Sequence, residues 1–215
     1  SFAGPERPYW RGFERTDEFS IDGDYSVKLT LDSDSNPKTS SLIVGAIQNL
    51  DIEAMPEELS GWVRVEDWKR GTMRQYVQIV VIVWDVTANY PPDHPHRNYQ
   101  IAYTFGGVEK APLKIANRKF LLLNDALDLD DGEGGIVESE WVRFDLNPRE
   151  DFKRLWGVDP SDYRYIRVLY EVRYDGRDDE FETDAKAHVY WDGLHFGPDL
   201  NGEADWPLEH EAETE

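Results

Sequence analysis

The sequence contains no cysteine, so it can form neither disulfide bonds nor zinc sites with thiolate ligands. It also lacks any apolar run near the roughly 18 residues that a membrane-spanning helix needs. Basic residues are scarce, since 23 Lys and Arg, few of them Lys, stand against 44 Asp and Glu. The formal net charge of -21 repels nucleic acids and anionic membranes, so neither nucleic-acid binding nor membrane insertion is expected.

The acidity itself has two interpretations. A halophilic protein carries such a surface because concentrated salt screens the repulsion between its own charges. Alternatively, clustered carboxylates and carbonyl oxygens bind divalent cations, above all calcium. Acidic runs at residues 32–36, 128–133 and 175–180 suit this second use, although none has the spacing of the twelve-residue calcium loop, and each could simply be a solvated turn.

The length of 215 residues fits a single β domain, because no linker rich in Pro or Ser divides the chain. We expect one domain over residues 1–215, with extended terminal segments at 1–11 and 198–215. Trp10 and Trp206 are the candidate anchors of these segments, either within the chain or on a neighbouring copy.

Apolar and polar residues alternate along most of the chain, which predicts β-strands. In residues 25–31 the alternation places Tyr25, Val27, Leu29 and Leu31 on one face, which predicts a half-buried strand. The other predicted strands span 42–48, 61–66, 75–84, 98–105, 119–123, 141–145, 166–174 and 188–196. Asp-Gly and Gly-Gly pairs between them favour turns. The pattern predicts an all-β protein, a jelly-roll β-sandwich of two antiparallel sheets.

One short helix is expected at about 148–156. Asn147 suits the N-cap, Pro148 the first helical position, and Gly157 the end of the helix. Phe152 and Trp156 form its apolar side, which predicts that the helix closes one end of the sandwich.

The two ends of the chain carry a family likeness. Gly12-Phe13-Glu14, then residues 23–29, and finally Tyr190-Trp191-Asp192 within the closing strand resemble the first and last strands of jelly-roll carbohydrate-binding modules with a galactose-binding-like sandwich. The resemblance is limited to these terminal strands. It implies a structural calcium ion between the terminal strands, with Glu14, Asp24 and Asp192 as ligands. The alternative is that Glu14 and Asp192 are surface carboxylates or accept hydrogen bonds from nearby backbone.

An independent indication of a binding site comes from two middle strands. Each has one face of aliphatic core residues and an opposite face that mixes aromatic, apolar and charged side chains. The candidate ligand-binding residues on these mixed faces are Arg74, Tyr76, Gln78, Trp84, Arg167, Glu171 and Arg173. Aromatic rings cover the apolar face of a sugar while planar polar groups bond its hydroxyls, and Arg adds capture of a carboxylate. The other interpretation, which a sandwich of this size favours, is that a long loop covers this face, buries Val80, Ile82 and Leu169, and leaves the Arg side chains paired to Glu171.

A catalytic interpretation is also open. His94, His96 and Arg97 lie in a Pro-rich segment shortly before Tyr99, and a jelly-roll polysaccharide lyase or hydrolase acting on an acidic polysaccharide could use them.

The sequence therefore favours a non-catalytic, calcium-stabilised carbohydrate-binding or recognition module, secreted or at the cell surface. The alternatives are the enzyme just described and a structural subunit of a calcium-dependent extracellular filament or layer, which would assemble through the terminal segments.

Overall fold

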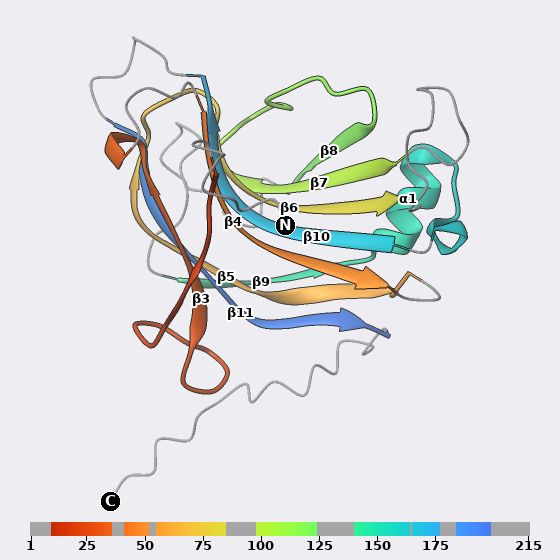
Figure 1. The fold of residues 1–215 in the computed structure, drawn as a ribbon, viewed down its shortest axis with the longest axis horizontal. Helices are drawn as coiled ribbons and strands as arrows, with labels where there is room; N and C mark the ends of the chain where they lie inside the picture. The colour runs from red at the N-terminus through yellow and green to blue at the C-terminus, as the bar shows by residue number, and fades with distance from the viewer. Residues whose placement is uncertain are drawn as a thin grey trace, which may run out of the picture.

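The computed structural model describes residues 10–35, 41–51, 55–84, 98–123, 140–163, 165–176 and 184–198. Their strands form two stacked sheets (Figure 1). The six-stranded sheet contains, in spatial order, β1 (Trp10–Arg11), β4 (Ser41–Asp51), β10 (Tyr165–Asp175), β6 (Gln75–Trp84), β7 (Tyr99–Gly106) and β8 (Arg118–Leu122). The five-stranded sheet contains β2 (Glu14–Thr16), β3 (Ser26–Asp32), β11 (Lys186–Gly197), β5 (Glu58–Lys69) and β9 (Trp141–Leu146).

The strand order is that of a jelly roll. The antiparallel set β4-β10-β6-β7 faces the antiparallel set β3-β11-β5-β9, and the chain crosses between the sheets repeatedly from β3 to β6 and again from β9 to β11. This arrangement is the double Greek key of a jelly roll, so the predicted fold class is confirmed. Two edge strands depart from the antiparallel pattern, because β1 pairs with β4 and β8 with β7 in parallel.

The core lies between the sheets and is built by the predicted alternation. β6 contributes Val77, Ile79, Val81 and Val83, all fully buried. Across the core, the rings of Phe105, Phe144 and Trp191 meet edge to face at centroid distances of 5.2–5.9 Å. Each sheet therefore has one face buried in the core, and polar side chains lie on the opposite, outer face.

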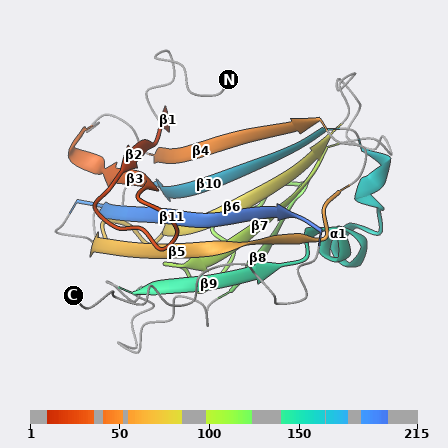
Figure 2. The same ribbon diagram turned by 90° about the horizontal axis from the view of Figure 1, so that it is seen from below.

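The predicted helix is present as α1 (Pro148–Trp156) and lies at one end of the sandwich (Figures 1 and 2). The Asn147 side chain accepts a hydrogen bond from the Glu150 amide, and Gly157 ends the helix with φ 66°. Phe152 is fully buried in the core, and the indole of Trp156 donates to the Gln100 carbonyl at 3.3 Å. Within the ranges given above, none of the helices has the length and apolar character needed to span a bilayer.

Part of the expected N-terminal extension is paired, because Trp10 and Arg11 form β1. Residues 1–9 and 199–215, which include Trp206, lie outside the described residues.

Candidate functional site

The outer face of the six-stranded sheet, which points away from the core, carries the mixed side chains that the sequence predicted. Cross-strand register places Glu171 beside Gln78, and Gln78 beside Thr104. One step along the strands, Arg173 lies beside Tyr76. The face therefore consists of rows of side chains running across the strands, and these rows differ sharply in exposure.

A buried charged cluster occupies one end of this face. It consists of Tyr76, Gln78, Glu171, Arg173 and Asp175, each less than a tenth exposed. The Arg173 guanidinium donates to both Asp175 oxygens, at 2.5 and 3.1 Å, and its other terminal nitrogen lies 3.7 Å from Glu171. The Tyr76 hydroxyl donates to Asp175 at 2.6 Å, and the Gln78 amide nitrogen donates to Glu171 at 2.6 Å.

The pKa shifts in this cluster reflect mutual stabilisation. Burial alone would lower the pKa of Arg173, but the neighbouring acidic groups Tyr76, Glu171 and Asp175 outweigh it and raise that pKa. Burial raises the pKa of Tyr76 far above its ordinary value, so the phenol stays neutral and keeps its donor proton. The alternative that the sequence left open, Arg paired to its own carboxylates, describes Arg173 in this structure.

Two polar atoms in or beside the cluster have no hydrogen-bond partner among the described residues. They are Oε1 of Gln78 and Oγ1 of Thr104, and both side chains are fully buried. Gln78 must keep its orientation, because turning the amide over would bring its oxygen against the Glu171 carboxylate. Reassigning the Gln78 amide therefore does not remove these two unsatisfied atoms.

We expect Thr104→Val to raise the free energy of unfolding by about 1 kcal/mol, because valine keeps the shape and removes a buried hydroxyl that bonds none of the described residues. Urea denaturation measures the change. Gln78→Met is the matched control and should destabilise, since it leaves Glu171 without its donor. A clear loss of stability in Thr104→Val would show that the hydroxyl has a partner and would contradict this prediction.

Next to the charged cluster lies an apolar band. It is formed by Val80, Ala102 and Leu169, of which Val80 and Ala102 are 0% exposed, and it is packed by Ile43, Ile47, Ile82 and Phe120. Such complete burial means that the middle of this face is covered rather than open to solvent. A ligand would meet the face beyond this band.

Beyond the band, at the end nearest α1, is a partly exposed aromatic end formed by Trp84, Tyr165 and Arg167. The rings of Trp84 and Tyr165 stack, with centroids 5.8 Å apart and an interplanar angle of 27°. The Arg167 guanidinium lies 4.8 Å from the Trp84 ring centroid and donates to the Asn49 side chain at 2.6 Å. Burial lowers the pKa of Arg167. A flat aromatic surface bordered by planar polar groups results.

Arg118 completes the same side of the sheet and was missed by the sequence analysis. It lies across β7 and β6 from Arg167, in one continuous row with Gln100 and Ile82. Its Nε donates to the Gln100 side chain at 2.8 Å, and its guanidinium lies 5.9 Å from the centroid of the Phe120 ring. The only signal in the sequence was its position, one residue before a predicted strand.

Arg74 does not join the other candidate ligand residues. It precedes β6, is exposed, and lies with its guanidinium against Gly176 in the turn after β10. Of the candidate ligand residues, Tyr76, Gln78, Glu171 and Arg173 fall in the charged cluster, whereas Trp84 and Arg167 fall in the aromatic end.

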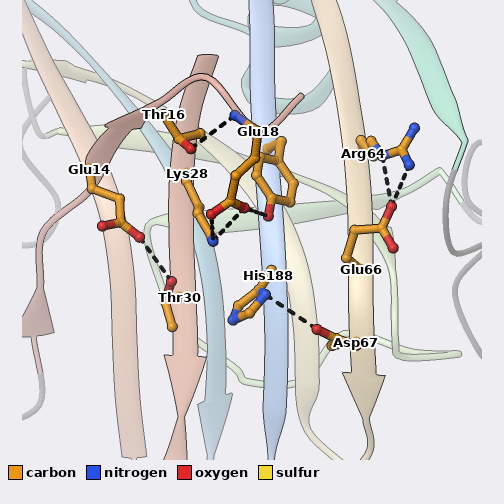
Figure 3. Close-up of polar contacts among 10 residues, drawn as sticks. Glu14, Thr16, Glu18, Lys28, Thr30, Arg64, Glu66, Asp67 and His188 are labelled. Atoms are coloured by element: carbon orange, nitrogen blue, oxygen red, sulfur yellow. Dashed lines mark hydrogen bonds and ion pairs between the residues drawn. The ribbon is translucent and has the colours of Figure 1, made fainter. Parts of the chain in front are cut away.

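The proposed calcium ligands lie on the five-stranded sheet and the loop that covers it. The buried Asp192 carboxylate accepts backbone N–H groups of Ile21, Asp22 and Gly193 at 2.7, 3.1 and 2.8 Å. Glu14 lies 3.4 Å from the Thr30 hydroxyl (Figure 3), and Asp24 is exposed. No group of three or more acidic or His side chains in the described ranges has a metal-binding arrangement. Calcium at these residues stays a prediction.

The outer face of the five-stranded sheet carries a second set of polar contacts (Figure 3). Lys28 donates to both Glu18 oxygens at 2.8 and 2.6 Å, and the Tyr190 hydroxyl donates to Glu18 at 2.6 Å. The hydrogen bond from Lys28 is the main reason that the pKa of Glu18 is lowered. Phe19 packs edge-on against Tyr190 at 5.1 Å. These groups satisfy one another, so the loop before β3 is held on its own sheet.

The candidate catalytic residues are divided. His94, His96 and Arg97 lie outside the described residues. Tyr99 packs on the core side of β7, with its ring 4.8 Å from that of Trp156 and 6.3 Å from that of Tyr163. Its contacts are those of a packing residue.

No protein-family model and no curated protein sequence matches the chain. Among solved structures, the chain is similar to a carbohydrate-binding module of the β-sandwich superfamily, with 10% identity and a TM-score of 0.44 over 86% of this chain and 52% of that one. It is also similar to a β-1,2-glucanase from Parabacteroides distasonis, with 14% identity and a TM-score of 0.41 over 86% of this chain and 20% of that one. The chain thus spans about half and a fifth of these two proteins.

Proposed function

We propose that the chain is a non-catalytic glycan-binding module whose ligand lies on the aromatic end of the six-stranded sheet. The observation that carries this proposal is the stacked, partly exposed pair Trp84 and Tyr165, bordered by Arg167 and Asn49. An aromatic surface of this kind covers the apolar face of a sugar ring, while the planar polar groups beside it bond the hydroxyls.

Three features of the face support binding without chemistry. The charged cluster and the apolar band are buried, so they support the binding surface and present no reactive group to solvent. Tyr76 stays neutral and is bonded to Asp175. Glu171 is held by Gln78 and lies close to Arg173. Glu171 and Asp175, the acids of the charged cluster, are therefore occupied by structural hydrogen bonds and ion pairs.

Two further parts of the proposal concern the environment of the module. Polysaccharides occur mainly outside the cell or at its surface, so we include a secreted or cell-surface location in the proposal. Calcium bound by Glu14, Asp24 and Asp192 would join the first strands to the last and stabilise the folded chain. Assembly through the terminal segments stays a separate prediction.

Replacing the central ring is the direct test. Trp84→Ala should weaken glycan binding by about tenfold, because it removes the stacking surface. Binding is measured by calorimetry and affinity electrophoresis with neutral β-glucan oligosaccharides and oligogalacturonates. Thermal melts and circular dichroism verify that the variant is folded.

Tyr25→Ala is the matched control, because Tyr25 is an exposed ring that also lies beside a guanidinium, that of Arg15 at 3.5 Å, but on the five-stranded sheet. It should bind glycans like the wild type. Equal binding by Trp84→Ala and the wild type would place the ligand elsewhere, and silence of the wild type toward every glycan would remove the proposed function.

A further inference from the structure

Arg118 is a partly buried guanidinium with few partners of its own. Its Nε bonds the neutral Gln100 side chain at 2.8 Å, and the ring of Phe120 lies below its guanidinium. Among the residues that the structure describes, no carboxylate lies within ion-pair distance of it, and its terminal nitrogens make no hydrogen bond there. Four N–H donors on these two nitrogens therefore remain for another group.

Arg173, on the same face, is a guanidinium whose charge and N–H donors are paired with carboxylates. It is bound through two nitrogens to Asp175, and its third approaches Glu171. Glu171 is also the acid whose charge acts most strongly on Arg118, but one of its oxygens already bonds Gln78 at 2.6 Å. Among the residues that the structure describes, carboxylates therefore pair with Arg173 and not with Arg118.

Burial makes the unpaired charge of Arg118 unfavourable in free energy. It lowers the pKa of Arg118, and the Glu171 charge offsets that effect only in part. A charge removed from water is expected to have an anionic partner. Guanidinium groups bind carboxylates and sulfates through paired N–H bonds, which a neutral sugar cannot reproduce. The chemistry that Arg118 lacks is therefore an anionic oxygen pair.

The position of Arg118 connects it to the aromatic end. Arg167, Ile82, Gln100 and Arg118 stand in one row across β10, β6, β7 and β8. Three strand spacings separate the ends of this row, or about 14 Å between backbones. A short oligosaccharide that stacks on Trp84 and runs across the strands is long enough to cover this backbone distance to β8, where the Arg118 guanidinium lies near Phe120.

We propose that Arg118 binds the negatively charged group of an acidic glycan, a carboxylate or a sulfate, while a neighbouring sugar of the same chain stacks on Trp84 and Tyr165. This inference rests on the proposed function and names its ligand class. It also assigns a role to a cation in a chain whose net charge is -21.

The test compares three ligands of similar length at 0.15 M salt, where the Debye length of about 8 Å limits long-range repulsion by the acidic surface. They are an oligogalacturonate, a sulfated oligosaccharide and a neutral β-glucan oligosaccharide. The wild type should prefer one of the two anionic ligands, and that preference identifies the group that Arg118 binds.

Arg118→Gln should weaken this binding by about tenfold to a hundredfold. It should leave binding of the neutral ligand unchanged, which also shows that the variant is folded.

Arg118→Lys keeps the charge without the paired donors and should fall between the wild type and Arg118→Gln. Arg143→Gln, which removes the same charge from β9 of the other sheet, should bind like the wild type. If the wild type binds only neutral glycans, or if Arg118→Gln keeps full affinity for the anionic ligand, this inference fails while glycan binding stands. If no glycan binds, both fail.

Discussion

Arg173→Met should lower the free energy of unfolding by about 3–5 kcal/mol, because it leaves Asp175 and Glu171 buried without their cation. Both carboxylates are less than a tenth exposed, so water cannot replace the guanidinium. Methionine retains most of the volume, and the loss therefore reports charge and hydrogen bonding rather than a cavity. Urea denaturation followed by circular dichroism measures the change.

The matched control is Arg154→Met. Arg154 also pairs with an acid, Asp151, but its side chain is 60% exposed, so only a small loss is expected. Adding Glu171→Gln and Asp175→Asn to Arg173→Met should restore part of the stability, because the buried negative charges are then gone. A loss below about 1 kcal/mol in Arg173→Met would mean that the cluster is hydrated and would contradict the buried-cluster account.

Asp192→Ala should lower the free energy of unfolding by about 3 kcal/mol even in the presence of a chelator, since a buried carboxylate accepting three backbone N–H groups is removed. Two of these donors, Ile21 and Asp22, lie in the loop before β3, so the variant should also loosen that loop at these two residues, while the Glu18 contacts still hold its first part. Asp192→Asn keeps one acceptor oxygen and should lose less. Thermal melts in chelator measure both.

Repeating these melts with calcium and with monovalent salt separates the predicted ion from the hydrogen bonds. A ligand that binds only the folded state stabilises it by about 2.7 kcal/mol at a hundredfold excess over Kd. If calcium binds at Glu14, Asp24 and Asp192, it raises the Tm of the wild type and not of Asp192→Ala. Equal rescue by monovalent salt would favour the halophilic interpretation of the acidic surface. A stable Asp192→Ala in chelator would contradict the hydrogen-bond account.

Much of the fold was predictable because alternation is a local property of a strand that has one face on a core. All nine strands predicted from the sequence are present, as is the helix at 148–156. The missed strands, β1 and β2, have two and three residues, too few to show a period. Their pairing, like the parallel pairing of β8, depends on where distant segments meet, which local pattern does not specify.

The candidate site was predictable only in part, for the same reason. Alternation placed Tyr76, Gln78 and Glu171 on one face but left open whether that face is covered. The burial of Val80 agrees with the covered interpretation, whereas the burial of Ala102 was not predicted. Nor could it show that Arg173 is used by the chain's own carboxylates. Arg118 became visible only through the register of β8 against β7, which sets it in a row with Gln100.

The most direct test of glycan binding at the aromatic end is an NMR titration that locates the ligand on the protein. Isotope-labelled wild-type protein is titrated with an oligogalacturonate and with a neutral β-glucan oligosaccharide. The account predicts that the shifted signals are the Trp84 indole N–H and the amides around Trp84, Tyr165 and Arg167, with Arg118 affected by the acidic ligand alone. Shifts confined to the outer face of the five-stranded sheet around Tyr190, or none with either sugar, would contradict it.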